Sequence, residues 1–276
     1  MRKLFRLLAL ITIPLFAIRL LNVLLNIDPV TGFYTNDSRI TIILSLAFLV
    51  VALILMAVQV KKSPPSFGAP SAGTLPASFF CISALSTAVG SVFLLLGVFS
   101  QVTLKEIFMS RRALLEAGFV SSHFRIEFWC SLIGFVAAAW FLFAAVRFLR
   151  DGDLSGHPWF CCVPVIWFCL RALADYSIAP VNPNNTIILA SLAADLVLAV
   201  FFFRFCRFAA LGHPPDDLKK LVVPALLVFI FTISFKSPLV VFAVETSFAE
   251  ALYIISDSFA AAAAFCLTDK LLKENP

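Results

Sequence analysis

The chain has 276 residues, of which 61% are hydrophobic and only 13% are charged, and its formal net charge at pH 7 is +5. A soluble domain of this length carries about a quarter charged residues, so most of this protein's surface must face lipid, and a water-soluble domain is excluded. The apolar runs are continuous and about twice as long as the ten-residue strands of a transmembrane barrel. These features predict an all-α integral membrane protein with a single transmembrane domain over 1–276.

Apolar runs of about 20 residues, the length that crosses ~30 Å of hydrocarbon, recur along the chain. The N-terminal run stays apolar to Leu25 without a small-residue cleavage site, which favours an uncleaved first span over a signal peptide. We predict a polytopic bundle of about eight transmembrane helices, over 4–25, 40–60, 77–99, 126–147, 159–179, 186–206, 221–240 and 247–268.

Lys and Arg gather at the ends of these runs, a pattern that indicates membrane topology rather than nucleic-acid binding. Most of them fall on the cytoplasmic side if both termini are cytoplasmic, and we expect the plasma membrane of a bacterium. The exceptions concentrate in 101–125, where apolar residues at helical spacing predict an amphipathic helix in the interface. That helix is either a connector resting on the membrane or a lid over an external cavity. If it is cytoplasmic, one flanking span is misassigned.

Weak internal similarity relates the two halves of the chain. TIILSLA at 41–47 recurs as TIILASLA at 186–193, and Glu127 and Glu250 precede runs of alanine at equal spacing. These echoes suggest two parallel four-helix repeats, 1–150 and 159–276, an arrangement found in transporters. The alternative is that apolar sequences resemble one another by chance.

Charged residues inside the predicted spans are the strongest functional signal. A charge at that depth costs roughly 2.5–3.5 kcal/mol on insertion scales, so it needs a partner or water. Arg171 and Asp195 fall at similar depth on antiparallel neighbours, and we expect them to meet. Asp175 lies one turn from Arg171 on the same face and is also within its reach. Lys236 and Glu250 are expected nearer the membrane surface.

Two more charged residues fall at similar depth in the first and last spans, which completes a belt of mixed charge. We predict that this belt forms a substrate-binding site from Arg19, Arg171, Asp175, Asp195 and Asp257. In one interpretation these residues form ion pairs that hold helices together. In the other they line a polar cavity, where Arg binds a carboxylate or phosphate and Asp takes up a proton.

Motifs of soluble catalysis do not occur in the chain. It has no glycine loop for phosphate, no HExxH zinc pair and no GxSxG elbow, so hydrolase and nucleotide-dependent chemistry have no support. Cysteines at 161, 162 and 206 and histidines at 157 and 213 are ligand types for zinc or copper, but their spacing matches no ligand motif. We therefore expect no metal and no cofactor, and an enzyme is not favoured.

Two functions remain open from the sequence. The first is a transporter-like protein or permease-like subunit with a polar site between the first, fifth, sixth and eighth spans. The second is a non-catalytic membrane subunit or sensor whose buried charges are structural. The expected partners are the lipid bilayer, a small solute or ion and other membrane subunits, and no nucleic acid.

Overall fold

The computed structural model of the chain describes residues 2–26, 39–62, 74–109, 123–150, 160–178, 186–210 and 215–272. Helices account for 95% of these residues. In chain order they are α1 Arg2–Ala9, α2 Thr12–Asn26, α3 Arg39–Lys62, α4 Thr74–Gln101, α5 Leu104–Ile107, α7 His123–Leu149, the 3₁₀ turn η1 Phe160–Cys162, α8 Val163–Ile178, α9 Thr186–Ala210, α10 Pro215–Phe231, the π-helical η2 Thr232–Lys236, the 3₁₀ turn η3 Ser237–Leu239, α11 Val240–Thr246 and α12 Phe248–Leu271.

Within the described part of the chain, six segments are helical, long and apolar enough to cross a membrane. They are Arg2–Asn26, Thr74–Gln101, His123–Leu149, Ile188–Ala209, Lys219–Thr246 and Phe248–Leu271. The fold is therefore compatible with a multi-pass membrane protein, whereas the predicted count of eight spans is not confirmed. The two other predicted spans, 40–60 and 159–179, correspond to α3 and to η1 with α8, which are helical but are not among the six.

Prolines explain where the helices begin and break. Pro76, Pro164 and Pro215 lie in the first turns of α4, α8 and α10, where a missing N–H costs nothing. The first span breaks at residues 10–11 because Pro14 has no N–H to donate to the carbonyl four residues earlier. The seventh predicted span, 221–240, proves longer, because α10, η2, η3 and α11 form one interrupted helical segment that ends only at residue 246.

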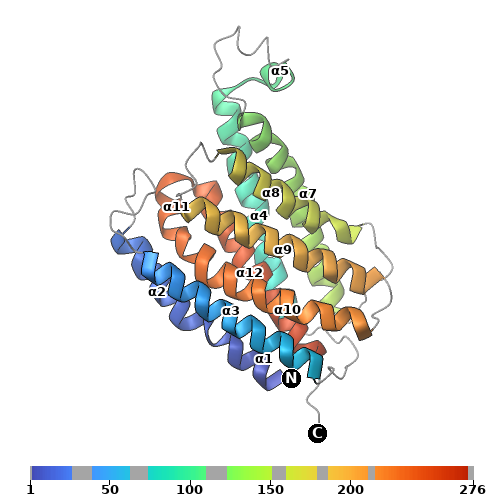
Figure 1. Ribbon diagram of the computed structural model, residues 1–276. Coiled ribbons are helices and arrows are strands. Elements are labelled where there is room, and N and C mark those ends of the chain that lie inside the picture. The colour runs from blue at the N-terminus through green and yellow to red at the C-terminus, as the bar shows by residue number, and fades with distance from the viewer. Residues whose placement is uncertain are drawn as a thin grey trace.

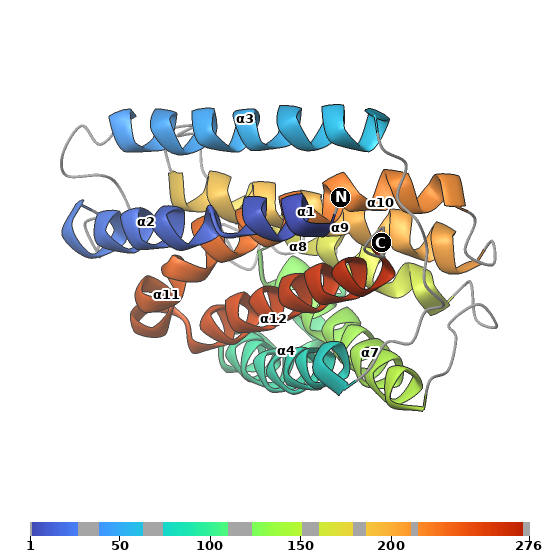
Figure 2. The ribbon, with the colours of Figure 1, turned by 90° about the horizontal axis from the view of Figure 1, so that it is seen from below.

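Six elements form a closed ring. In order around it, α12 packs on α4, α4 on α7, α7 on α8, α8 on α9, α9 on α10 and α10 on α12. The first span packs outside the ring: α1 contacts α10, and α2 contacts η2, η3 and α11. Helix α3 is the most peripheral, lying along one edge of the bundle (Figures 1 and 2).

Aromatic side chains fill one half of the ring. The rings of Phe80, Trp140, Phe141, Phe168 and Phe202 contact one another from α4, α7, α8 and α9, and all five are fully buried. They lie toward the N-terminal ends of α4 and α8 and the C-terminal ends of α7 and α9. This half of the ring is therefore a solid hydrophobic core.

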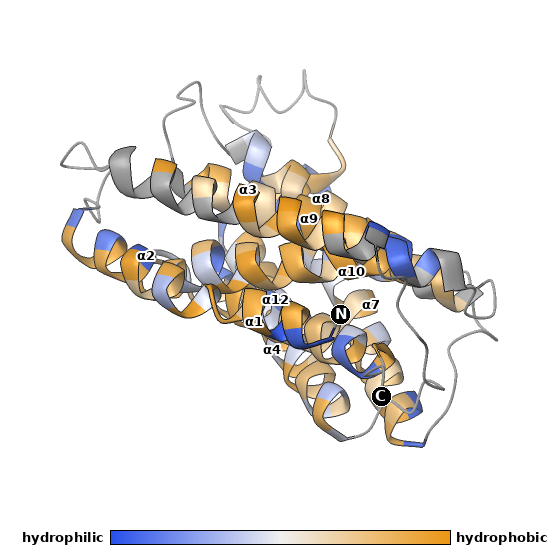
Figure 3. Ribbon diagram, turned by 60° about the horizontal axis from the view of Figure 1, so that its bottom comes forward, coloured by the Kyte–Doolittle hydropathy of each residue, from blue (hydrophilic) through white to orange (hydrophobic). Residues whose placement is uncertain are grey.

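Apolar side chains also cover the outside of the bundle. Leu85, Leu142 and Phe203 are more than half exposed, although each lies well inside a long helix rather than at its end. Hydrophilic residues gather mainly at helix ends, whereas the lengths between are apolar (Figure 3). A surface of this kind suggests that the helices are embedded in a membrane.

The predicted interfacial helix over 101–125 lies partly outside the described residues. Helix α4 continues to its first residue, Gln101, and α7 already begins at His123. Between them only the short helix α5 is described, with the Glu106 carboxylate accepting a hydrogen bond from the Thr103 backbone N–H at 2.6 Å. This hydrogen bond holds the pKa of Glu106 below its usual range. The amphipathic helix itself stays a prediction.

Candidate functional site

Arg171 on α8 forms a two-pronged ion pair with Glu250 at the start of α12. Its Nη1 and Nη2 donate to the two carboxylate oxygens of Glu250 at 2.9 and 2.7 Å. The guanidinium carbon also lies 4.5 Å from the ring centroid of Tyr253, one turn further along α12. Bidentate charge-assisted hydrogen bonds and a cation–π contact together fix the orientation of the guanidinium.

A cavity of about 330 Å³ adjoins this ion pair. It lies in the half of the ring opposite the aromatic core, at the C-terminal ends of α4 and α8 and the N-terminal ends of α7, α9 and α12. Thr246 and Ser247 line the cavity and are exposed, so it reaches the surface at the junction of α11 and α12. Its volume lies at the small end of the range for sites that hold small organic molecules, roughly 300–1,000 Å³.

Polar groups in this cavity are mainly acceptors. Besides the Arg171–Glu250 pair, its wall carries Asp175, Glu127 and Ser191 among largely apolar side chains. The Oδ2 atom of Asp175 is buried and accepts no hydrogen bond from the described residues. A second cavity of about 250 Å³ shares Glu127 with the first. With Arg171 already paired with Glu250, the remaining carboxyl groups of the wall are those of Asp175 and Glu127.

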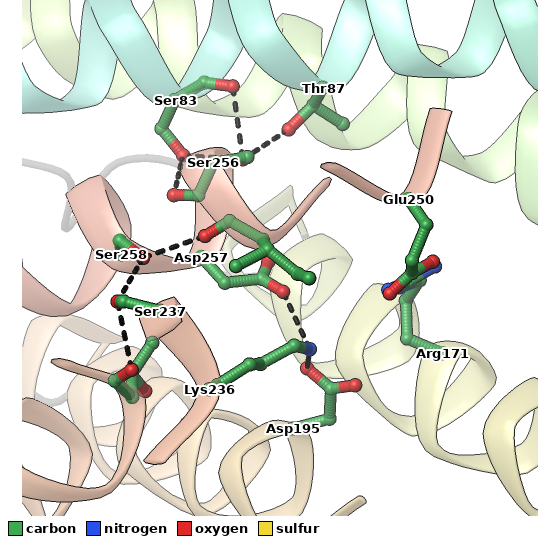
Figure 4. A network of polar contacts seen from close by, with 12 residues as sticks. Ser83, Thr87, Arg171, Asp195, Lys236, Ser237, Glu250, Ser256, Asp257 and Ser258 are labelled. Carbon is green, nitrogen blue, oxygen red and sulfur yellow. Dashed lines mark hydrogen bonds and ion pairs between the residues drawn. The ribbon is translucent and has the colours of Figure 1, made fainter. Parts of the chain in front are cut away.

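A second charge cluster lies deeper in the bundle (Figure 4). The Nζ atom of Lys236 on η2 lies 2.5 Å from Oδ1 of Asp195 on α9 and 2.7 Å from Oδ2 of Asp257 on α12. All three residues are fully buried. We call Lys236, Asp195 and Asp257 the lysine triad.

A ladder of hydroxyl groups joins α4 to α12 beside the triad (Figure 4). The Ser256 hydroxyl lies 2.9 Å from that of Ser83 and 2.5 Å from that of Thr87, and the Ser91 hydroxyl lies 3.1 Å from that of Tyr253. Small side chains let the two helices approach closely, and their hydroxyls are satisfied across the interface. This contact is structural and holds Tyr253 beneath Arg171.

The five predicted site residues therefore separate into three places. Arg171 and Asp175 line the cavity, whereas Asp195 and Asp257 belong to the lysine triad. Arg19 is buried on α2, which packs against η2 and η3 outside the ring. The expected Arg171–Asp195 ion pair gives way to Arg171–Glu250 and Lys236–Asp195, because Arg171 faces α12 and Asp195 faces η2.

Sequence reasoning missed three residues of these clusters. Lys236 is fully buried rather than near the surface, and Glu250 pairs with the buried Arg171 of α8. Glu127 is noticeable in the sequence only as part of the internal similarity, which does not assign it to a site. The useful signal was Pro238, two residues after Lys236, because a proline inside an apolar run marks an interrupted helix whose charged residues face the protein.

The described residues contain no candidate metal site. Among the described residues, no group of three or more His, Cys, Asp or Glu side chains is placed to hold a metal ion. His157 and His213, from the weak sequence constellation, lie outside the described residues. The cysteines at 81, 130, 169 and 266 are free thiols.

Comparison with models of protein families, with curated proteins and with solved structures finds no match to this chain.

Proposed function

We propose that the protein is a multi-pass membrane transporter, or a permease-like subunit, whose solute site is the cavity beside Arg171. The observation that carries the proposal is the shape of the ring. A cavity with an oriented guanidinium and one carboxyl oxygen that accepts no hydrogen bond from the described residues occupies one half, and a solid aromatic core closes the other. A solute-binding protein that is open on one side of the membrane requires this arrangement.

The wall of the cavity favours a small organic amine. Asp175 and Glu127 offer carboxylate groups to a cation, and Asp175 has a buried oxygen without a donor among the described residues. Tyr253, Ile254 and Leu94 offer an apolar surface for the body of such a molecule. A solute that also carries a carboxylate would compete with Glu250 for Arg171.

The proposed topology counts α3 and η1–α8 as spans, which makes eight. Both termini are then cytoplasmic, the membrane is the bacterial plasma membrane and the cavity opens to the outside. The two-repeat hypothesis gains one supporting detail, since Glu127 and Glu250, at equivalent positions of the two halves, both line the cavity.

The experiment asks whether solutes enter the cavity. In a cysteine-free variant, Ser191→Cys places a thiol in the cavity wall, and Ser83→Cys places one in the α4–α12 interface. We expect a small cationic methanethiosulfonate reagent to modify the former at least tenfold faster than the latter. The rate should fall when Asp175→Asn is added or when the protein is saturated with an amine that it transports into proteoliposomes.

A structural role for the buried charges is the second candidate. It is favoured by one observation, which is that Arg171 and Lys236 both have carboxylate partners already. In that case the cavity is not entered, and Ser191→Cys should be as unreactive as Ser83→Cys. Equal, slow modification of both thiols would refute the transport proposal.

A further inference from the structure

The lysine triad has an unbalanced charge. Lys236 supplies one ammonium, whereas Asp195 and Asp257 supply two carboxyl groups, and none of the three side chains is more than 1% exposed. An isolated ionised group in such a place is very costly, so buried charges are paired or neutralised. If both carboxyl groups were ionised, one negative charge would remain without compensation.

Among the described residues on the cavity side, no neighbouring group supplies the missing positive charge. On the cavity side the charged groups that act on the triad include Arg171, Glu250 and Asp175, and the Arg171 guanidinium is already held by Glu250. Asp175 adds a further carboxyl group. On the other side α2 packs against η2 and carries the buried Arg19, whereas the ion pairs of Lys236 are with Asp195 and Asp257.

Two buried oxygen atoms of the triad also lack a hydrogen-bond donor among the described residues. Oδ2 of Asp195 and Oδ1 of Asp257 are buried, and neither accepts a hydrogen bond from any described residue. Buried carboxylate oxygens are normally hydrogen-bonded, so each such atom requires an explanation. Charge balance and hydrogen bonding therefore both require one additional positive charge that occupies almost no space, which is a proton.

We propose that Asp195 and Asp257 share one exchangeable proton above Lys236 and that this triad is the proton-coupling site of the protein. One carboxylate takes the proton from water to become a neutral carboxyl group, and no other bond changes. Both carboxyl groups lie within 2.7 Å of the same ammonium nitrogen, so the proton is assigned to the two together rather than to one of them. The coupling role rests on the transport function proposed above.

A proton fits the triad better than a metal cation does. Hard cations require several oxygen ligands around them. Here the Lys236 ammonium already lies within 2.7 Å of both carboxyl groups and would repel a second cation from the same place. The triad therefore lacks one positive charge but does not provide the oxygen ligands that a metal cation requires.

The triad lies directly below the solute cavity. Asp195 follows the cavity residue Ser191 by one turn of α9, and Asp257 follows the cavity residue Glu250 by two turns of α12. Asp257 is nine residues after Phe248, the first residue of its span, which is about 14 Å into the membrane at ~1.5 Å per residue. The proton would therefore bind near the middle of the bilayer and enter through the cavity.

Lys236 also lies in the interrupted part of the α10–α11 segment, where a change in charge can alter the position of the helix. It is the last residue of the π-helical segment η2, and η3 with Pro238 follows at once. Interrupted helices form the ion sites of many transporters, and π-helical turns are frequent at functional sites. Release of the proton would leave a net negative charge beside Lys236 and change the attraction that holds this segment against α9 and α12.

Infrared spectroscopy of the full chain in detergent micelles tests the proposal directly. A shared proton gives a C=O stretching band of a protonated carboxyl group at neutral pH, which shifts in D₂O and disappears reversibly at high pH. We expect this band to be lost in Asp195→Asn and in Asp257→Asn, because either change leaves one carboxylate paired with Lys236. Asp269→Asn, which removes an ion-paired carboxylate far from the triad, is the matched control and should retain the band.

Three results would overturn the proposal: no such band in the wild type, its persistence in both triad variants, or its loss in Asp175→Asn or Glu127→Gln instead. Replacing choline by Na⁺ at constant pH should leave the band unchanged. Its disappearance on addition of Na⁺ would identify a sodium site instead. The band does not depend on transport, so its assignment can fail while Ser191→Cys is still modified, and the converse also holds.

Discussion

Arg171 is 3% exposed, and its guanidinium is oriented by Glu250 on one side and the ring of Tyr253 on the other. Glu250 is less enclosed, since its side chain is 33% exposed. The pair thus joins a buried cation to a carboxylate that touches the cavity. Such a pair stabilises the contact between α8 and α12 and places its charged groups at the wall of the cavity.

Replacement of Arg171 should be costly. In Arg171→Leu the Glu250 carboxylate loses its partner, and breaking a buried pair costs roughly 3–5 kcal/mol of unfolding free energy. We expect a value near the lower end, about 3 kcal/mol, because Glu250 retains contact with the cavity. Unfolding by denaturant in detergent micelles measures the loss.

The double variant identifies the partner of Arg171. Arg171→Leu with Glu250→Leu should recover most of the lost stability, since two apolar side chains can replace a buried pair at little cost. Arg171→Leu with Asp195→Leu should be less stable than Arg171→Leu alone, because it also removes a partner of Lys236. Recovery with Asp195 and not with Glu250 would contradict the observed pairing.

The interrupted helix from α10 to α11 has a local cause. Pro238 cannot donate a backbone hydrogen bond, and the Ser237 N–H bonds the Thr232 carbonyl five residues earlier, which is the π-helical pattern. The Ser237 hydroxyl donates to the same carbonyl at 2.9 Å. The extra residue in this turn places Lys236 against α9 and α12.

Close packing of α4, α7 and α8 depends on Gly134 in α7. A Cβ atom there would overlap the Ser91 hydroxyl oxygen and lie 3.2 Å from the Trp167 ring. Ser91 is held in place by Tyr253, so it cannot move without loss of that hydrogen bond. Gly134 therefore permits an approach of helices that any other residue prevents.

Gly134→Ala should lower the unfolding free energy by about 1–3 kcal/mol, the usual cost of overpacking. Addition of Ser91→Ala removes the overlapping oxygen and should restore part of the loss. Gly97→Ala in α4 is the matched control, because its Cβ would meet no atom within 4 Å. That control should be neutral or slightly stabilising, and a loss as large as that of Gly134→Ala would mean that glycine flexibility, not packing, is responsible.

Ion pairs join the helices at the end of the bundle where α1 begins and α12 ends. Asp269 near the end of α12 accepts hydrogen bonds from Arg2 and Arg6 on α1, at 2.7–3.2 Å. At the start of α10, hydrogen bonding by Lys220 holds the pKa of Asp217 below its usual range, and Arg207 on α9 contacts the same carboxylate. Basic residues thus gather at the end opposite the cavity, in agreement with a cytoplasmic location for this end.

Thiol labelling in intact cells tests this orientation. In a cysteine-free variant, Asn184→Cys should react with a membrane-impermeant reagent, because the turn before α9 is expected outside. Gly68→Cys, Gly152→Cys and Asp216→Cys should react only after the membrane is permeabilised. Reaction of Asp216→Cys in intact cells without reaction of Asn184→Cys would reverse the orientation and place the cavity on the cytoplasmic side.

The membrane class, the helical fold and the positions of most helices follow from local composition. Long apolar runs have no soluble alternative, since their backbone must satisfy its own hydrogen bonds in lipid. Arg171 and Asp175 could be singled out for the same reason, because a charge inside such a run is costly wherever the helix packs. Both do line the cavity.

Partners could not be assigned in this way. Depth along a helix is a property of the chain, but two charges at equal depth meet only if their helices are neighbours and turn the right faces together. Those conditions depend on the ring order and on the rotation of each helix, which are set by shape: Gly134 against Ser91, the hydroxyl ladder of α4 and α12, and the interruption at Pro238. For this reason Arg171 pairs with Glu250, and Asp195 with Lys236, although depth alone favoured pairing Arg171 with Asp195.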